Sequence, residues 1–159
     1  MKTLYPFFKW ANDTWLGQTI SNSIWLFPAI EGVHIVALAL LFGAILVLNL
    51  RLMRVMMRDR SLPQLSKELD TWTLTSLVVI LVTGAMLFAS EAVKSFYSAP
   101  FRLKIVLLVA AIIFHYAISR RLMRKEDSEV SPALGKVAGA VAIVLWMGVG
   151  FAGRAIGFF

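Results

Sequence analysis

The feature that most constrains this chain is an apolar run of more than twenty residues, Trp25 to Arg51, which carries two ionisable side chains, Glu31 and His34. A helix rises about 1.5 Å per residue, so about twenty residues cross a hydrocarbon core of about 30 Å. An acid and an imidazole inside such a run are costly in lipid, so they should face a protein interior or a cofactor. Because Glu31 and His34 are three residues apart, we expect them on one face of the helix.

Three further apolar runs predict a four-helix unit. The chain has 159 residues, of which 59% are hydrophobic and 16% charged, and this is typical of an integral membrane protein. We predict an all-α fold in which residues 1–159 form a single transmembrane domain, an integral membrane four-helix bundle. The expected spans are about residues 25–50, 71–92, 101–119 and 132–153. Residues 1–24 are rich in Trp and Phe and lack the pattern of a signal peptide, so we expect a short interfacial segment there.

Local signals mark the ends and contacts of these helices. Ser61 followed by Pro63 predicts the start of a short helix along the membrane surface, and the Ser-Pro pair at 131–132 predicts the start of the fourth span. Gly135 and Gly139 form a GxxxG pattern, which predicts close packing of the fourth span against a neighbour.

The second span carries a single polar stripe. Ser76, Thr83 and Ser90 recur every seven residues and therefore lie along one side of the helix. Hydroxyl residues at this spacing usually indicate helix–helix packing in lipid, which is the interpretation we favour. A hydrogen bond to a buried cofactor is the alternative.

The formal net charge of +7 comes from basic residues in short connections beside the apolar runs. This distribution is typical of topology signals and of contacts with anionic lipid, so we expect the lipid bilayer as a partner and no nucleic acid. The connections after the first and third spans, with Lys136 counted in the second, carry ten of the sixteen Lys and Arg residues. The positive-inside rule then predicts that both termini lie on the outer side.

Two histidines in an apolar four-helix unit, His34 and His115, suggest haem b, because imidazoles ligate haem iron from facing helices. The first and third spans run in the same direction, and the two histidines differ in depth by about 12 Å counted from the span centres, or by roughly 6 Å counted from the outer ends. A site at His34 alone, with Lys104 or Arg102 near the haem propionates, fits these depths better than a shared haem. Glu31 either orients His34 or is an interfacial acid, and Lys104 either serves the site or extends to the lipid headgroups.

The pattern WLFPAIEGVHIVALALLFGAILVLNLRLM, followed by TGAMLFASEA and then PFRLKIVLLVAAIIFH, resembles an uncharacterised family of four-helix bacterial membrane proteins over nearly the whole chain. More distantly, His34 and the helix from Lys104 to His115 are similar to the HemJ-type membrane protoporphyrinogen oxidases and the CopD copper-resistance proteins. The HemJ-type resemblance implies a haem-binding protein in which His34 and Lys104 are the essential histidine and lysine. The family resemblance implies a multi-pass location in the bacterial inner (cytoplasmic) membrane.

Three function hypotheses follow. The first is a haem b-binding membrane protein with an electron-transfer or redox role, with His34 as the leading axial ligand and a redox partner or a second copy as its protein partner. The second is a copper or small-substrate transport or binding protein, suggested by the CopD likeness and by Met53, Met56 and Met57, although the lipid-facing end of the first helix explains these methionines better. The third is a structural subunit of a membrane complex. The sequence contains no cysteine, which excludes thiolate metal sites and cysteine nucleophiles but leaves the question of an enzyme open.

Overall fold

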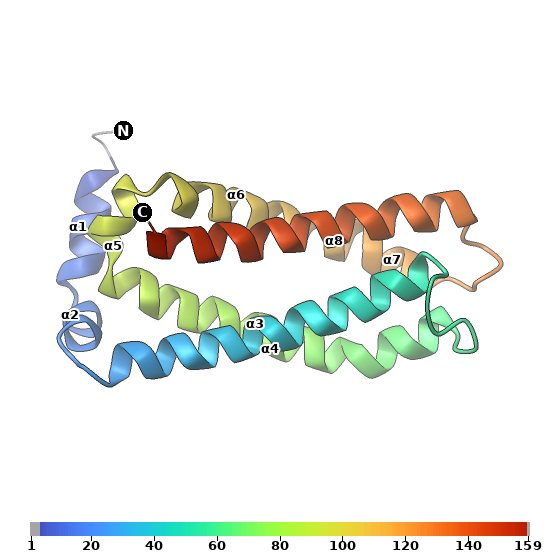
Figure 1. The fold of residues 1–159 in the computed structure, drawn as a ribbon, viewed down its shortest axis with the longest axis horizontal. Coiled ribbons are helices and arrows are strands. Elements are labelled where there is room, and N and C mark those ends of the chain that lie inside the picture. The colour runs from blue at the N-terminus through green and yellow to red at the C-terminus, as the bar shows by residue number, and fades with distance from the viewer. Residues whose placement is uncertain (1–3, 159) are drawn as a thin grey trace.

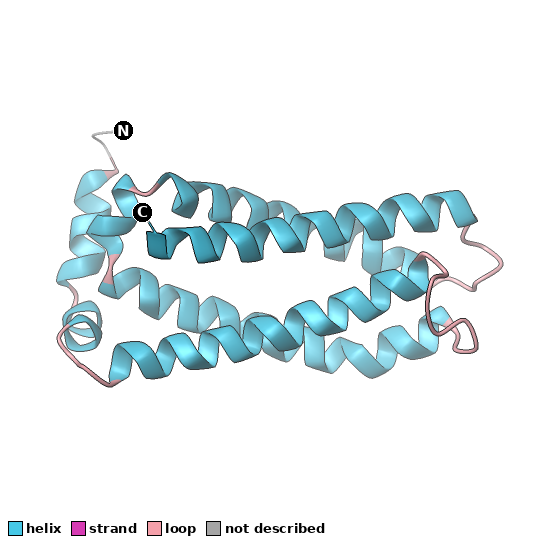
Figure 2. Ribbon diagram, in the orientation of Figure 1, coloured by secondary structure: helices cyan, strands magenta, loops and turns pink. Residues whose placement is uncertain are grey.

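The computed structural model describes residues 4–158 and shows a bundle of long helices (Figure 1). The long elements are α3 (Leu26–Leu52), α4 (Leu62–Ser90), α6 (Ala99–Phe114) with its continuation through η1 (His115–Ser119) and α7 (Arg120–Met123), and α8 (Pro132–Ala155). Each of the four is long and apolar enough to cross a membrane. All regular structure within residues 4–158 is helical (Figure 2), so the predicted all-α fold with four membrane-spanning helices is confirmed.

The two ends of the bundle differ. Three short helices, α1 (Tyr5–Asp13), α2 (Trp15–Ser21) and α5 (Ala92–Tyr97), lie at the end where both chain termini are found, which we call the terminal end (Figure 1). The connections 53–61 and 124–131 lie at the opposite end, which we call the loop end. Helices α1 and α2 occupy the expected interfacial segment, of which residues 1–3 lie outside the described part of the chain.

Serine caps start three of the long helices. The side chains of Ser61, Ser98 and Ser131 each accept a hydrogen bond from the backbone N–H three residues ahead, and a proline follows each serine within the first turn. The predicted helix starts at residues 61 and 131 are therefore confirmed. The helix that begins after Ser61 is α4 itself, so the expected surface helix forms the first turns of the second span.

Glycines bring α8 against α3 at the loop end. A Cβ atom added to Gly135 would lie 2.6 Å from the Leu52 carbonyl oxygen, and one added to Gly139 would lie 2.9 Å from the Asn49 carbonyl oxygen. The predicted close packing at the GxxxG pattern is therefore confirmed. Toward the terminal end α3 and α8 diverge (Figure 1), and a Cβ added to Gly150 would meet no atom within 4 Å among the described residues.

An apolar core fills the middle of the bundle. It consists of buried residues from all four long helices: Ala37, Leu41, Ile45, Leu77, Ile80, Ala111, Trp146 and Val149. Ala37 and Leu41 follow His34 by one and two helical turns, whereas Ala111 precedes His115 by one turn. The core therefore lies between the two histidines, and the polar interior has two separate parts.

Candidate functional site

The first polar part of the interior centres on His34 of α3. The residue is 8% exposed, and its Nδ1 lies 2.8 Å from the Oγ1 of Thr83 on α4. Gly84 is the next residue on α4, and a Cβ there would stand 3.4 Å from His34 Cε1. The imidazole therefore rests against a helix surface that has no side chain at this point.

The hydrogen bonds of Thr83 define the tautomer of His34. The Thr83 hydroxyl lies 2.6 Å from the Val79 carbonyl oxygen, which can only accept, so its single hydrogen is donated there. The hydroxyl oxygen must then accept from His34, which makes Nδ1 the protonated ring nitrogen. Nε2 therefore carries the lone pair, and it is the nitrogen that can bind a metal.

Lys104 of α6 lies near His34, and its side chain packs against α8. Its charge acts on His34. A Cβ atom added to Gly153 of α8 would lie 3.4 Å from both Cε and Nζ of Lys104. Among residues 4–158, Lys104 has no hydrogen bond and no ion pair. A lysine and a histidine from different helices therefore lie in the same part of the bundle, and within residues 4–158 neither forms an ion pair.

Aromatic rings separate this site from the terminal end. Phe88 lies one turn of α4 beyond Gly84, and Phe101 lies one turn of α6 before Lys104. The rings of Phe88 and Phe101 stack with their centroids 5.4 Å apart. Phe8 of α1 packs edge-on against Phe88 at 5.3 Å and against Phe96 of α5 at 5.3 Å. These four half-buried rings form an aromatic layer between the site and the terminal end.

The other residues predicted at the site lie elsewhere. Glu31 is exposed on α3, although we expected it on the same face as His34, and Arg102 is exposed on α6. The three methionines have different surroundings, because Met53 approaches Gly139, Met56 is 44% exposed, and Met57 packs on the apolar cluster of the loop end.

His115 lies in the second polar part of the interior, toward the loop end. It is 3% exposed, opens the π-helix η1, and is acted on by the charges of Arg120 and Asp70, which form an ion pair between α7 and α4. Its Nδ1 and the Ser119 hydroxyl are buried without a hydrogen-bond partner in the described part of the chain. His115 follows Lys104 by eleven residues of one helix, or about 16 Å. His115 therefore lies on the loop-end side of the apolar core, whereas His34 lies on its terminal-end side.

Sequence reasoning did not assign these interactions. The polar stripe of Ser76, Thr83 and Ser90 was interpreted as a helix-packing surface. The Thr83–Gly84 pair, in a span that packs near a membrane histidine, is the signal that could have predicted the hydrogen bond between Thr83 and His34. Asp70 and Arg120 stand at the edges of apolar runs, where charged residues normally contact headgroups, and nothing in their spacing indicates that they pair.

Four membrane-spanning helices with a buried histidine and a half-buried lysine between them define this chain as a multi-pass helical membrane protein with an internal polar site. The chain belongs to the family described as "Family of unknown function (DUF6644)", whose model matches residues 7–159. No match was found among curated proteins or among solved structures.

Proposed function

We propose that this protein binds one haem b at His34 and serves in electron transfer or a redox step in the bacterial inner membrane. The observation that carries the proposal is the buried imidazole whose Nδ1–H is held by Thr83 and whose Nε2 keeps its lone pair. In metal proteins the ligating histidine usually donates its other ring N–H to a neighbouring acceptor, which fixes the tautomer and the ring orientation.

The set of donors at the site suits haem better than a bare ion. No group of three or more His, Cys, Asp or Glu side chains that could hold a metal ion occurs within residues 4–158. A bare zinc or copper ion needs several protein ligands, whereas the porphyrin supplies four and leaves only axial positions to the protein. One histidine is therefore sufficient for haem b.

Each residue of the site has a role in this proposal. His34 Nε2 would bind the iron, Thr83 orients the ring, and Lys104 would pair with a propionate carboxylate. Gly84 and Gly153 leave the flanking helix surfaces free of side chains, and the aromatic layer lies between the site and the terminal end. Haem b, when bound, supplies one-electron exchange at its iron.

The sequence resemblance supports the same assignment. In the HemJ-type likeness, His34 and Lys104 take the positions of the essential histidine and lysine, and these two residues come from different helices. The charge of the basic connections supports an orientation with the loop end in the cytoplasm and the site in the outer half of the membrane.

The test is the absorption spectrum of the detergent-purified protein, oxidised and then reduced with dithionite, together with a titration of the protein with haem. We expect a Soret band, about one haem per chain and a high-spin spectrum, because His34 is the only histidine on the terminal-end side of the apolar core in the described part of the chain. A protein that stays colourless after haem supplementation would refute the proposal. Sharp low-spin bands would refute ligation by a single histidine.

Replacing Thr83 with valine tests the orienting hydrogen bond. Valine keeps the shape of threonine but cannot accept from His34 Nδ1, so we expect the haem affinity to fall about 10- to 100-fold. The matched control is Thr73→Val, since Thr73 is also buried on α4 and donates to the Leu69 carbonyl oxygen at 2.8 Å without contacting a histidine. Thr83→Ser should retain most of the affinity. Equal affinities for the two valine variants would show that Thr83 serves packing alone.

A further inference from the structure

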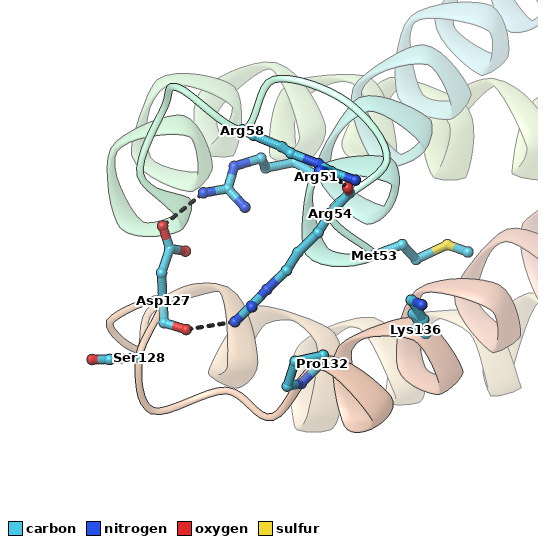
Figure 3. A pocket seen from close by; sticks show the side chains of 8 residues that line it. All are labelled: Arg51, Met53, Arg54, Arg58, Asp127, Ser128, Pro132 and Lys136. Atoms are coloured by element: carbon cyan, nitrogen blue, oxygen red, sulfur yellow. Dashed lines mark hydrogen bonds and ion pairs between the residues drawn. The ribbon is translucent and has the colours of Figure 1, made fainter.

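A second site of different chemistry lies at the loop end. A cavity of about 580 Å³ opens between the connection after α3 and the connection before α8 (Figure 3). Its lining residues are Arg51, Met53, Arg54, Arg58, Asp127, Ser128, Pro132 and Lys136. These residues come from the end of α3, the start of α8 and the two connections beside them. The cavity therefore lies at the depth where a bilayer has its headgroups.

The cavity has an excess of positive charge. Its lining holds four basic side chains and one carboxylate, and the carboxylate of Asp127 is paired with Arg51 at 2.7 Å. Arg54 donates only to backbone carbonyl oxygens, those of Asp127 at 2.9 Å and Val130 at 3.1 Å. Four positive charges less one negative charge leave a net charge of +3 on the lining.

The two remaining cations are available to a ligand. Arg58 donates from Nε to the Arg54 carbonyl oxygen, which leaves the terminal nitrogens of its guanidinium without a partner in the described part of the chain. Lys136 has no hydrogen bond or ion pair with any residue from 4 to 158. Guanidinium and ammonium groups that meet no carboxylate are the usual ligands of phosphate oxygens.

The backbone of the connection is fixed in an unusual conformation. Arg54 and Met57 have φ angles of 59° and 54°, in the left-handed region that favours glycine. Such residues persist where the surroundings determine the local conformation, and they are found at ligand-binding segments. Here the Arg54 side chain spans from the connection after α3 to the connection before α8 (Figure 3), so the cavity wall is held in place.

We propose that this cavity binds the phosphate of an anionic phospholipid headgroup. The net charge of +3 matches a headgroup with two phosphates better than a headgroup with one. Met53 and Pro132 add apolar lining beside the basic side chains, as a site that receives a headgroup together with the start of its acyl chains requires. This site is independent of the haem proposal, because it shares no residue with the site at His34.

The experiment is lipid titration of the purified full chain, followed by native mass spectrometry. The probes are cardiolipin, phosphatidylglycerol and phosphatidylcholine. We expect cardiolipin to bind most tightly and phosphatidylcholine least. Arg58→Gln and Lys136→Gln should each weaken cardiolipin binding about 5-fold, and the double variant about 30-fold, because one basic residue near anionic lipid contributes roughly this factor. Circular dichroism of each variant verifies the fold.

Two exposed basic residues at the same end provide matched controls. Lys67→Gln and Arg121→Gln remove the same charge outside the cavity, so they should leave cardiolipin binding within about 2-fold of the parent protein. Equal losses in the cavity and control variants, or equal binding of cardiolipin and phosphatidylcholine, would overturn the proposal. A further arm adds roughly 10 mM inorganic phosphate, a concentration that occupies a free-phosphate site of millimolar affinity. Displacement of cardiolipin by that phosphate would assign the cavity to the free anion and overturn the lipid assignment.

Discussion

Replacing His34 with alanine is expected to abolish the Soret band of the haem-reconstituted protein. His34 provides the only imidazole in the diverging half of the bundle, and its Nε2 is the nitrogen that carries a lone pair. In the proposed site, loss of His34 would remove the protein ligand of the iron, so only contacts to the rest of the haem would remain. The measurement is a haem titration of the purified variant followed by absorbance.

The matched control is His115→Ala, which removes the other buried histidine. It should keep the Soret band, because His115 lies beyond the apolar core from His34. Added imidazole should restore absorbance to His34→Ala by entering the space that the side chain leaves. An unchanged spectrum in His34→Ala, or loss of the band in His115→Ala alone, would contradict the assignment of the site.

Replacing Asp127 with asparagine is expected to lower the free energy of unfolding by about 1 kcal/mol, because the Arg51 side chain is buried but the Asp127 carboxylate is 41% exposed. The Arg51 side chain is 4% exposed, and its terminal nitrogen lies 2.7 Å from Asp127 Oδ2. Asparagine keeps the shape of the side chain but removes its charge, so the buried guanidinium loses its counter-ion. Unfolding of the detergent-solubilised variant, followed by circular dichroism, measures the change.

Asp59→Asn is the matched control, because Asp59 is an exposed carboxylate in the connection after α3. It should change the free energy of unfolding by less than about 0.5 kcal/mol. The double variant Arg51→Met with Asp127→Asn should recover much of the loss, since it replaces the buried guanidinium left without its carboxylate by an apolar side chain. A loss from Asp127→Asn no larger than that from Asp59→Asn would show that the Arg51 ion pair contributes nothing to stability.

The fold could be predicted from the sequence because a membrane restricts a chain to few structures. Apolar runs of sufficient length must be helical in lipid, where every backbone polar group needs an internal partner. The serine and proline signals at residues 61 and 131 then marked where two of the helices begin. The short helix α5 lies between the second and third predicted spans and was not predicted, because six residues are too few to show a periodic pattern.

The site could be predicted only in part. Depth along a helix can be counted from sequence, so His34 and His115 could be assigned different depths. Orientation around the axis could not be counted, because α3 and α6 are apolar on all sides and lipid accepts the same side chains as the core. For this reason the sequence left Glu31 open between a partner of His34 and an interfacial acid, and the exposed position of Glu31 fits the second. The contact of Thr83 with His34 depends on how two helices pack.

The π-helix at His115–Ser119 gives the third long helix a tolerance for a change in length. A π-helical turn contains one residue more than the α-helical path, while the segments before and after it keep their facing. A chain one residue shorter within η1 would form an uninterrupted α-helix and still direct Arg120 toward Asp70. The same deletion within α6 would rotate every later residue by about 100° and separate that ion pair. The extra residue therefore lies in the same turn as His115 and Ser119. The Nδ1 of His115 and the hydroxyl of Ser119 are buried without a hydrogen-bond partner among the described residues.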